Sequence, residues 1–430
     1  MLFRRRHHGR PHTPLMGVFR LLGPGLITGA SDDDPSGIAT YSQAGAQFGY
    51  GLAWTMLFTW PLMAAIQEIS ARIGRVTGEG IAANVRKHYP PLLLRAIVLL
   101  LLVANIINLG ADLGAMGDAL RLLLPVPTGL GVIGFALSCA ALEVFLSYRR
   151  YVSILKWLTL ALFAYIAAAF VVHVPWQEVF YRTFIPAFQW RTDYIVVIVA
   201  VLGTTISPYM FFWQASEEAE DERVDPDAQP LTETPQVAGR EIRRMEIDTY
   251  IGMGLSNAIG LFIIITTAAT LHLHGITNIE TSEQAAEALR PIAGEFAFAV
   301  FTCGLVGTGL LAVPVLAGSA AYAVAEAMGW RVGLGRRPRE AKAFYGTIVI
   351  GTLIGVAVNF IHIDPIKALF WTAVINGVVA VPMMVVMMLM TARRDIMGDF
   401  TLPPLLRLFG WASTATMAFA VAVMFATWGD

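Results

Sequence analysis

The sequence predicts an all-α integral membrane protein with about eleven membrane-spanning helices. Of its 430 residues, 56% are hydrophobic and 14% are charged, whereas soluble domains average roughly 45–50% apolar and about 25% charged residues. The mean hydropathy is +0.62, and apolar runs long enough to cross a bilayer recur along the whole chain. Charge this sparse excludes a disordered chain, a secreted domain held by disulfides and a nucleic-acid-binding domain.

Eleven apolar segments have about the 20 residues that a spanning helix needs. They are residues 20–47, 50–73, 92–122, 128–147, 151–173, 194–215, 246–271, 295–328, 343–361, 366–391 and 404–427. Residues 1–18 precede them as a predicted cytoplasmic tail. A cleaved signal is not expected there, because no small-residue cleavage site follows the arginines of this tail. The last helix and an external C-terminus are predicted within residues 404–430.

Basic residues predict the orientation of the chain. They gather after the second, fourth, sixth, eighth and tenth spans, and the intervening loops hold only scattered cations. Because cytoplasmic loops are rich in Lys and Arg, the N-terminus is predicted in the cytoplasm and the C-terminus outside, in the inner (plasma) membrane. The polar stretch from Glu217 to Glu241 is predicted to be a flexible cytoplasmic loop.

Two spans are interrupted where a continuous helix is expected. In the first span Asp32, Asp33 and Asp34 precede Pro35, although a central Asp costs roughly 2.5–3.5 kcal/mol in a membrane. The sixth span contains a similar interruption, Gly203-Thr204-Thr205-Ile206-Ser207-Pro208-Tyr209. Each proline removes a backbone donor and disrupts the helix.

The placement of the two interruptions predicts an inverted repeat. Five spans separate their starts, and an odd number reverses the direction of the chain. Residues 194–391 are therefore expected to form a second five-helix unit, inverted relative to residues 19–173. Paired broken helices in such repeats build a site near the middle of the membrane in secondary transporters. A cation site is predicted at the two breaks, with a simple kink and a water-facing acid as the alternative.

At these residues the chain resembles the Nramp family of divalent metal transporters, which have a LeuT-type fold of the APC superfamily. The matching motifs are Gly23-Pro24-Gly25, Asp34-Pro35, Ile38-Ala39-Thr40, Gln43-Ala44-Gly45-Ala46, Ser70-Ala71-Arg72-Ile73-Gly74 and Val76-Thr77-Gly78. With Pro208 of the sixth span, the resemblance covers nearly the whole chain. It implies a transporter rather than an enzyme.

The departures from the family pattern concern the implied metal ligands. Asp34 matches the metal-binding Asp, but Gly37 stands where the family has Asn and Ser207 where it has Met. A thioether is a soft ligand that favours transition metals, so its loss removes the main discriminator against Mg²⁺. A wider site also suits Mg²⁺, which usually keeps several waters. Thr204 and Asn376 complete the predicted set of metal ligands, together with backbone carbonyls near Gly37.

The residues that the family uses for proton coupling are mostly absent. Asp112 is kept, but Ala115 replaces a Glu, and Tyr209 and Gln214 replace two histidines. A proton relay needs groups that titrate near the working pH. The pattern is therefore similar to the Nramp-related magnesium transporter branch, whose members resemble uncoupled carriers.

Five polar residues remain as candidates for the vestibule or the pathway: Asp32, Asp33, Asp112, Tyr209 and Gln214. For the first two, lining the site and ending a helix in a water-filled vestibule are equal alternatives. Asp112 is interpreted as a pathway or charge-balancing residue, with polar packing as the alternative.

The sequence thus predicts a secondary transporter that takes up hydrated Mg²⁺, and Mn²⁺ as well, by alternating access without proton coupling. The metal ion is the substrate, and no cofactor, nucleic acid or obligate protein partner is expected beside the lipid bilayer. A proton-coupled Mn²⁺/Fe²⁺ transporter is the nearest alternative. A sodium-coupled carrier of organic solutes and a non-transporting membrane sensor are the others, and the three aspartates at the first break disfavour the solute carrier.

Overall fold

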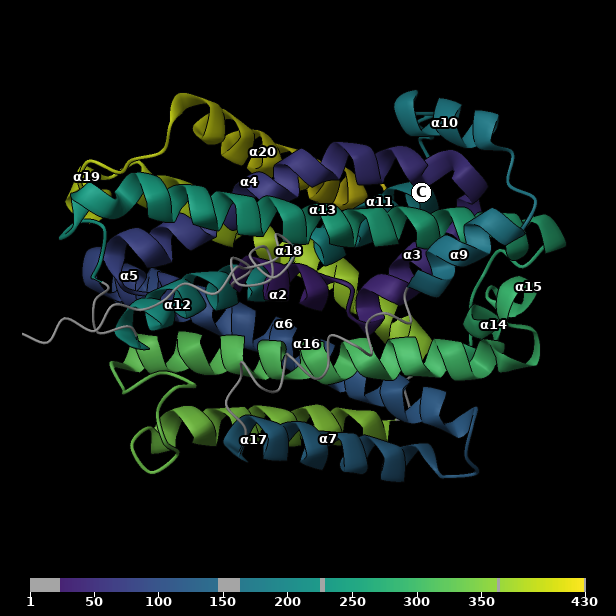
Figure 1. The fold of residues 1–430 in the computed structure, drawn as a ribbon, viewed down its shortest axis with the longest axis horizontal. Helices are drawn as coiled ribbons and strands as arrows, with labels where there is room; N and C mark the ends of the chain where they lie inside the picture. The colour runs from purple at the N-terminus through teal and green to yellow at the C-terminus, as the bar shows by residue number, and fades with distance from the viewer. Residues whose placement is uncertain (1–23, 146–162, 225–228, 362–363, 429–430) are drawn as a thin grey trace, which may run out of the picture.

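The computed structural model describes residues 24–145, 163–224, 229–361 and 364–428. Every regular element within these residues is a helix (Figure 1), so the prediction of an all-α protein is confirmed. Seven of the described helices, one of them a broken pair, are long and apolar enough to cross a membrane. Several others are shorter or are divided by a break.

The predicted spans coincide with helices or with pairs of helices. The helices that coincide with the predicted spans are α2 (Pro24–Asp32), α3 (Pro35–Phe48), α4 (Ala53–Thr77), α6 (Pro91–Arg121), α7 (Thr128–Phe145), α9 (Phe163–Val171), α11 (Thr192–Thr205), α12 (Pro208–Val224), α13 (Ala238–Thr270), α16 (Ala297–Met328), α17 (Lys342–Val358), α18 (Pro365–Thr391) and α20 (Pro404–Ala426). Residues 151–162 of the predicted fifth span lie outside the described part of the chain.

Further short helices lie between these elements. They are α5 (Ile81–His88), α10 (Trp176–Phe184), α14 (Ser282–Glu287), α15 (Arg290–Ala293) and α19 (Arg394–Met397), with 3-10 turns at Gly49–Leu52, Pro235–Val237, His272–His274, Gly294–Phe296 and Asn359–Ile361.

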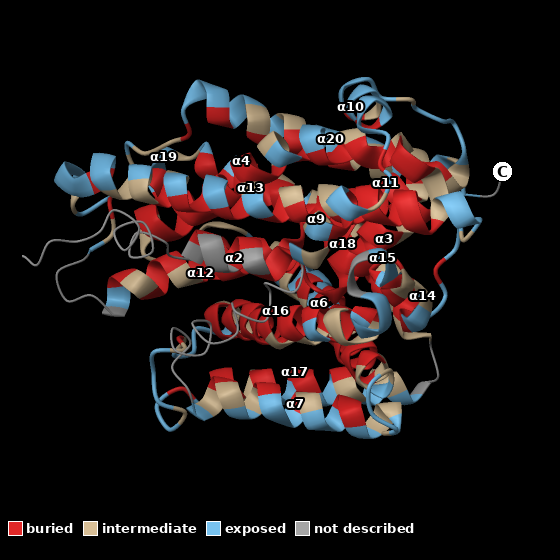
Figure 2. Cartoon of the chain, turned by 45° about the vertical axis from the view of Figure 1, so that its right-hand side comes forward, coloured by how far each residue is buried: buried red, intermediate tan, exposed pale blue. Residues whose placement is uncertain are grey.

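The broken helices lie in the buried centre of the bundle. Buried residues dominate α3, α11 and α18, whereas α7, α17 and α20 lie at the periphery (Figure 2). These outer helices expose large apolar side chains, among them Leu137, Leu353 and Phe419. Exposed apolar surface on this scale is typical of helices that contact lipid. The centre is therefore shielded from lipid by the surrounding helices.

Small residues allow the half-helix that precedes each break to pack closely against a neighbouring helix. Gly29 of α2 lies against the backbone of Gly252 in α13, and Gly203 of α11 lies against Ala373 and Gly377 in α18. Membrane helices approach this closely only where side chains are small. The half-helices α2 and α11 are therefore each fixed against a continuous helix.

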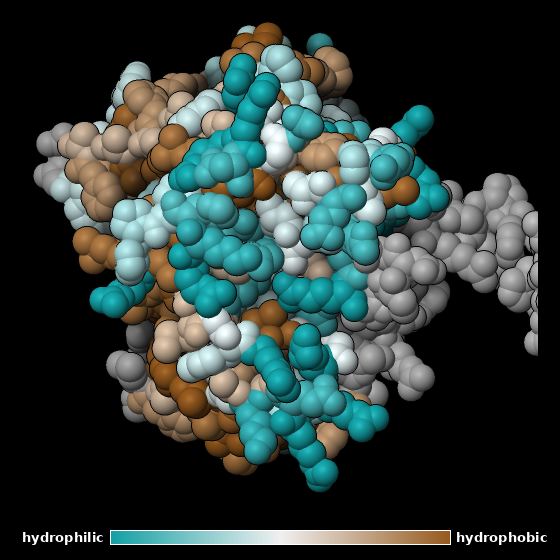
Figure 3. Space-filling view, turned by 90° about the vertical axis from the view of Figure 1, so that its left-hand side faces the viewer, coloured by the Kyte–Doolittle hydropathy of each residue, from teal (hydrophilic) through white to brown (hydrophobic). Residues whose placement is uncertain are grey.

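One end of the bundle collects the basic loops, and we call it the basic end. Arg75 pairs with Glu222 and Glu241, Arg86 lies beside Gly329, and Arg393 donates a hydrogen bond to a carbonyl at the end of α5. Figure 3 shows hydrophilic side chains over much of this face. The basic loops of the second, sixth, eighth and tenth spans therefore share one end, as the alternating pattern predicts. The cations at 149 and 150 lie outside the described residues.

The prediction of a flexible loop from Glu217 to Glu241 is wrong at both ends of that stretch. Helix α12 continues to Val224 and α13 begins at Ala238. Glu218 is buried and pairs with Arg244 at 3.4 Å, and the buried Glu222 pairs with Arg75 at the same distance. The acids are paired with arginines that lie far away in the sequence, and this explains why an acid-rich segment forms a helix here.

Candidate metal-ion site

The first break places a carboxylate at the start of a half-helix. Helix α2 ends at Asp32 and α3 begins at Pro35, so that Asp34 is the N-cap of α3. Its Oδ1 accepts hydrogen bonds from the Gly37 N–H at 2.7 Å and the Ser36 hydroxyl at 2.6 Å. Pro35 occupies the first helical position, where its missing N–H costs nothing. The positive end of the α3 dipole favours the Asp34 charge.

The second break has the same backbone plan but a neutral side chain. Helix α11 ends at Thr205 and α12 begins at Pro208. The hydroxyl of Ser207 donates to the carbonyls of Gly203 at 2.6 Å and Thr204 at 3.0 Å. Because a hydroxyl oxygen also has acceptor lone pairs, Ser207 can still accept from a water or face a cation.

The two breaks meet at Asp34. The Tyr209 hydroxyl, from the start of α12, donates to Asp34 Oδ2 at 3.4 Å and to the Ser31 carbonyl at 3.0 Å. Gly37 faces Thr204: a β-carbon on Gly37 would lie 3.3 Å from Thr204 Oγ1. Asp34 is 1% exposed. The structure therefore brings together four of the predicted site and pathway residues, Asp34, Gly37, Thr204 and Tyr209.

Asn108 of α6 also contacts this site and was missed in the sequence. Its Nδ2 donates to Asp34 Oδ2 at 3.2 Å. Asn108 stands four residues before Asp112, and side chains at this spacing lie on the same face of a helix. That spacing was the available signal. Asp112 is fully buried, lies within electrostatic range of Asp34, and has no hydrogen-bond partner among the described residues.

Asn376 lies on α18, the helix whose Gly377 packs against α11. It is buried, and neither its Oδ1 nor its Nδ2 has a partner in the described part of the protein. Helix α18 thus lies beside the second break, but no hydrogen bond joins Asn376 to the described site residues.

Asp32, Asp33 and Gln214 have different partners from Asp34. The Ser256 hydroxyl of α13 donates to both Asp32 and Asp33, at 3.2 Å in the case of Asp33. Gln214 accepts from the Thr28 hydroxyl of α2. These contacts tie α2 to α13 and α12, so the three residues form a polar interface beside the site.

The site is poor in metal-binding groups of the transition-metal type. Within the described residues, no three His, Cys, Asp or Glu side chains gather as a metal-binding group. The side chains bonded to Asp34 come from Ser36, Asn108 and Tyr209, which are all neutral. Oxygen ligands without thiolate, thioether or imidazole suit Mg²⁺, Ca²⁺ and Mn²⁺.

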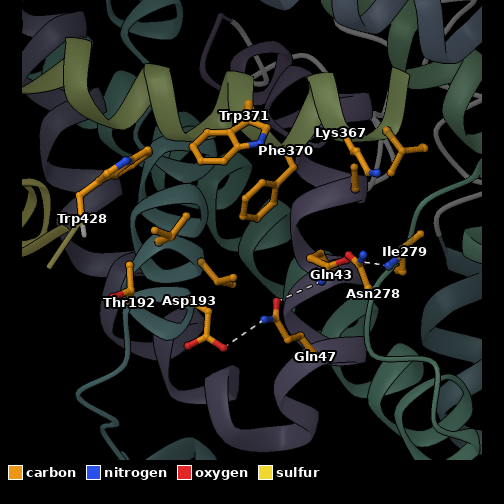
Figure 4. Close-up of a pocket in the computed structure, with 14 residues that line it drawn as sticks. Gln43, Gln47, Thr192, Asp193, Asn278, Ile279, Lys367, Phe370, Trp371 and Trp428 are labelled. Atoms are coloured by element: carbon orange, nitrogen blue, oxygen red, sulfur yellow. Dashed lines mark hydrogen bonds between the residues drawn. The ribbon is translucent and has the colours of Figure 1, made fainter. Parts of the chain in front are cut away.

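A cavity leads toward the breaks from the end opposite the basic end, which we call the vestibule end. It measures about 590 Å³ and is lined by residues of α3, α11, α18 and the 278–279 segment. Gln47 of α3 connects Gln43 with Asp193 of α11 through hydrogen bonds (Figure 4). Ala39, two residues after Gly37, also lines the cavity. The cavity therefore extends along α3 to within one turn of the site.

The fold and the paired breaks define a membrane transporter fold of the LeuT type. The family described as "Natural resistance-associated macrophage protein-like" (Nramp) matches residues 25–427. The chain belongs to the Nramp family, and the resemblance seen in its motifs is confirmed.

Relatives and solved structures agree with this assignment. The divalent metal cation transporter MntH of Klebsiella pneumoniae (strain 342) is 26% identical over 410 residues, which cover 92% of this chain and 91% of the relative. The manganese transporter of Eremococcus coleocola, solved with an aromatic bis-isothiourea substituted compound, superposes with a TM-score of 0.74 at 16% identity, over 98% of this chain and 90% of that one. MhsT in complex with L-phenylalanine gives a TM-score of 0.62 at 11% identity, over 94% and 98% of the two chains. At such identities the structural likeness shows the LeuT-type fold alone.

Proposed function

We propose that this chain is a secondary transporter for divalent cations, with hydrated Mg²⁺ as its main substrate and Mn²⁺ as a second one. The observation that carries the proposal is the buried carboxylate of Asp34, which lies where two broken helices meet and whose hydrogen-bond partners among the described residues are all neutral. Partial negative charge from the C-terminal ends of α2 and α11 adds to it. Relatives named as divalent metal cation and manganese transporters support the class of substrate.

Hard oxygen chemistry supports Mg²⁺ within that class. In the family pattern that this chain resembles, a methionine stands at the position of Ser207. A hydroxyl offers no preference for transition metals, and Mg²⁺ dehydrates reluctantly. In the proposed metal site Asp34 is the principal charged group, and Ser207, Thr204, Asn376 and carbonyls near Gly37 complete the shell of the ion through water.

The contacts of Tyr209 and Gln214 support transport without proton coupling. Both stand where the family has histidines, and both make hydrogen bonds that hold α2. The driving force is then the concentration gradient and the membrane potential. The potential contributes about 2.3 kcal/mol per charge for each 100 mV, and about twice that for a divalent ion.

The two ends suggest how access alternates. We assign the basic end to the cytoplasm, following the positive-inside rule, which leaves the C-terminus outside. The cavity of the vestibule end then faces outward, while ion pairs of Arg75 and Arg244 hold α12 against α4 and α13 at the cytoplasmic end. Units 19–173 and 194–391 are the proposed inverted repeats that move relative to each other.

Uptake into proteoliposomes tests the proposal. The wild-type protein is expected to admit Mg²⁺ and Mn²⁺ down their gradients, and Asp34→Ala is expected to abolish both fluxes. The matched control is Asp395→Ala, which removes an exposed carboxylate at the basic end. Unaltered uptake in Asp34→Ala would refute the site, and absence of any divalent flux in the wild type would favour a sensor.

A proton-coupled Mn²⁺/Fe²⁺ transporter is the second candidate. The observation in its favour is Asp112, a fully buried acid within electrostatic range of Asp34. Acidification of the vesicles in step with Mn²⁺ entry would establish this candidate in place of the first.

A further inference from the structure

Both oxygens of the Asp34 carboxylate already accept hydrogen bonds. Its Oδ1 accepts from Ser36 and Gly37, and its Oδ2 accepts from Asn108 and Tyr209. An ionised carboxylate has about four lone-pair sites. A cation that bound Asp34 directly would have to displace some of these bonds. A cation that keeps its water shell can instead use the charge of Asp34 at a distance and find other partners for its waters.

Helix α6 carries buried acceptors that lack partners. Asn108 Oδ1 and both carboxylate oxygens of Asp112 have no hydrogen-bond partner among the described residues, and both side chains are fully buried. The orientation of the Asn108 amide follows from its contact, because an ionised Asp34 can only accept and must face the NH₂ group. Asn108 Oδ1 is therefore the atom of this amide that has no partner among the described residues. A buried acceptor without a partner costs free energy. We therefore expect Asn108 Oδ1 and the Asp112 carboxylate to face a hydrogen-bond donor.

The waters around a divalent cation are donors. Their lone pairs point at the metal and their hydrogens point outward, so a site that holds a hydrated ion must offer acceptors. Mg²⁺ is the common divalent ion that most often keeps several waters when bound. The face of α6 that contains Asn108 and Asp112 offers acceptors of this kind next to a buried negative charge.

We propose that Asn108 and Asp112 recognise the hydration shell of the transported cation. Asn108 Oδ1 and the Asp112 carboxylate accept hydrogen bonds from the metal-bound waters, while Asp34 supplies the attracting charge. The two residues then determine selectivity for a hydrated ion over one that binds after dehydration. This inference rests on the proposed function, since it names the residues that select the ion.

Asn105 provides a matched control on the same helix. It lies one turn before Asn108, is buried, and also has an unpaired Oδ1. Its Nδ2, however, donates to the Leu316 carbonyl of α16 at 3.0 Å, and it makes no bond to Asp34. A change at Asn105 removes a buried amide of the same type from α6 without touching the carboxylate of the site.

Hexaamminecobalt(III) is the probe that tests the inference. It is an exchange-inert octahedral cation whose ammine ligands donate hydrogen bonds but cannot be shed. We expect it to inhibit Mg²⁺ uptake by the wild-type protein in proteoliposomes, and to bind the purified protein in calorimetry. A wild-type protein that transports Mg²⁺ but neither binds the complex nor is inhibited by it would overturn the inference and leave the proposed function standing.

Variants assign the effect to α6. Asn108→Leu should lower Mg²⁺ uptake roughly tenfold, the size expected for lost hydrogen bonds to a charged group, with a smaller loss for Mn²⁺ and loss of inhibition by the complex. Asp112→Asn, which keeps one acceptor oxygen and removes the charge, should weaken inhibition in the same direction. Asn105→Leu should leave the ratio of Mg²⁺ to Mn²⁺ uptake unchanged. Equal losses in Asn105→Leu and Asn108→Leu would contradict the assignment, and a wild-type protein without Mg²⁺ uptake would refute the proposed function and this inference together.

Discussion

The two broken helices share a backbone design and differ in charge. Each break is followed by a half-helix that begins with proline, Pro35 in α3 and Pro208 in α12. At the first break Asp34 caps the following half-helix with a carboxylate, whereas at the second Ser207 donates its hydroxyl back to α11. The comparison teaches that the backbone opening is common to both breaks, whereas the carboxylate, on which the proposed cation site depends, precedes the proline of the first one.

The half-helices that precede the two breaks are packed in the same way. Gly29 fixes α2 to α13, and Gly203 fixes α11 to α18. The half-helices before the breaks are thus held by close backbone contact. The carboxylate of Asp34 lies at the start of α3, the half-helix that follows the first break. Variants that remove the charge, alter the neutral break or overpack a helix contact can separate these contributions.

Removing the charge of the first break should have the largest effect. Asp34→Asn keeps the shape of the side chain, but it should lower Mg²⁺ uptake by about a hundredfold, since partners of a charged group contribute up to about 3 kcal/mol. Initial rates in proteoliposomes measure the loss. Asp395→Asn, at the exposed basic end, should keep wild-type rates, and a similar loss there would point to a general defect.

Changing the neutral break should alter selectivity more than rate. Ser207→Met introduces a soft thioether, so the ratio of Mg²⁺ to Mn²⁺ uptake should fall about tenfold, at the lower end of the effects of single changes around metal ligands. Competition between the two ions in the same vesicles measures the ratio. Ser207→Ala lacks both the hydroxyl and the sulfur and should lower both fluxes alike; a shift toward Mn²⁺ in that variant would show that the sulfur is not the cause.

Overpacking the contact between α11 and α18 should reduce stability. In Gly203→Ala the added methyl would meet the Ala373 carbonyl and the Gly377 backbone, and overpacking of this kind costs about 1–3 kcal/mol. Thermal unfolding of the purified protein measures the change. Gly346→Ala in α17 is the control, because a β-carbon there meets nothing within 4 Å. Equal stability of the two variants would contradict the close contact between α11 and α18.

Removing one donor from Asp34 should have the smallest effect. Ser36→Ala deletes one of the two donors to Oδ1 and leaves the Gly37 N–H in place. The apparent affinity for Mg²⁺ should weaken by about threefold, as for a single hydrogen bond. The concentration dependence of uptake gives this value. Ser138→Ala, whose hydroxyl bonds only its own helix on the exposed face of α7, should leave the affinity unaltered.

The sequence predicted those parts of the structure that depend on local chemistry. Apolar runs and two prolines defined the spans and breaks. The cost of buried acids drew attention to the three aspartates of the first break, and the resemblance to the family singled out Asp34 among them. Asn108 was not predicted as a site residue, because the role of an amide in an apolar helix depends on a partner that is distant in the sequence. The acid-rich end of α12 was predicted to be a loop for the same reason, since Arg75 and Arg244 approach it only in the folded chain.

The most direct test of the account follows Mg²⁺ influx and internal pH in the same proteoliposomes at a fixed membrane potential. The account predicts that Mg²⁺ enters at a rate set by its own electrochemical gradient while internal pH stays constant, and that the rate falls by about a hundredfold in Asp34→Asn. Acidification proportional to metal entry, or Mg²⁺ entry that survives the loss of the Asp34 charge, would contradict it.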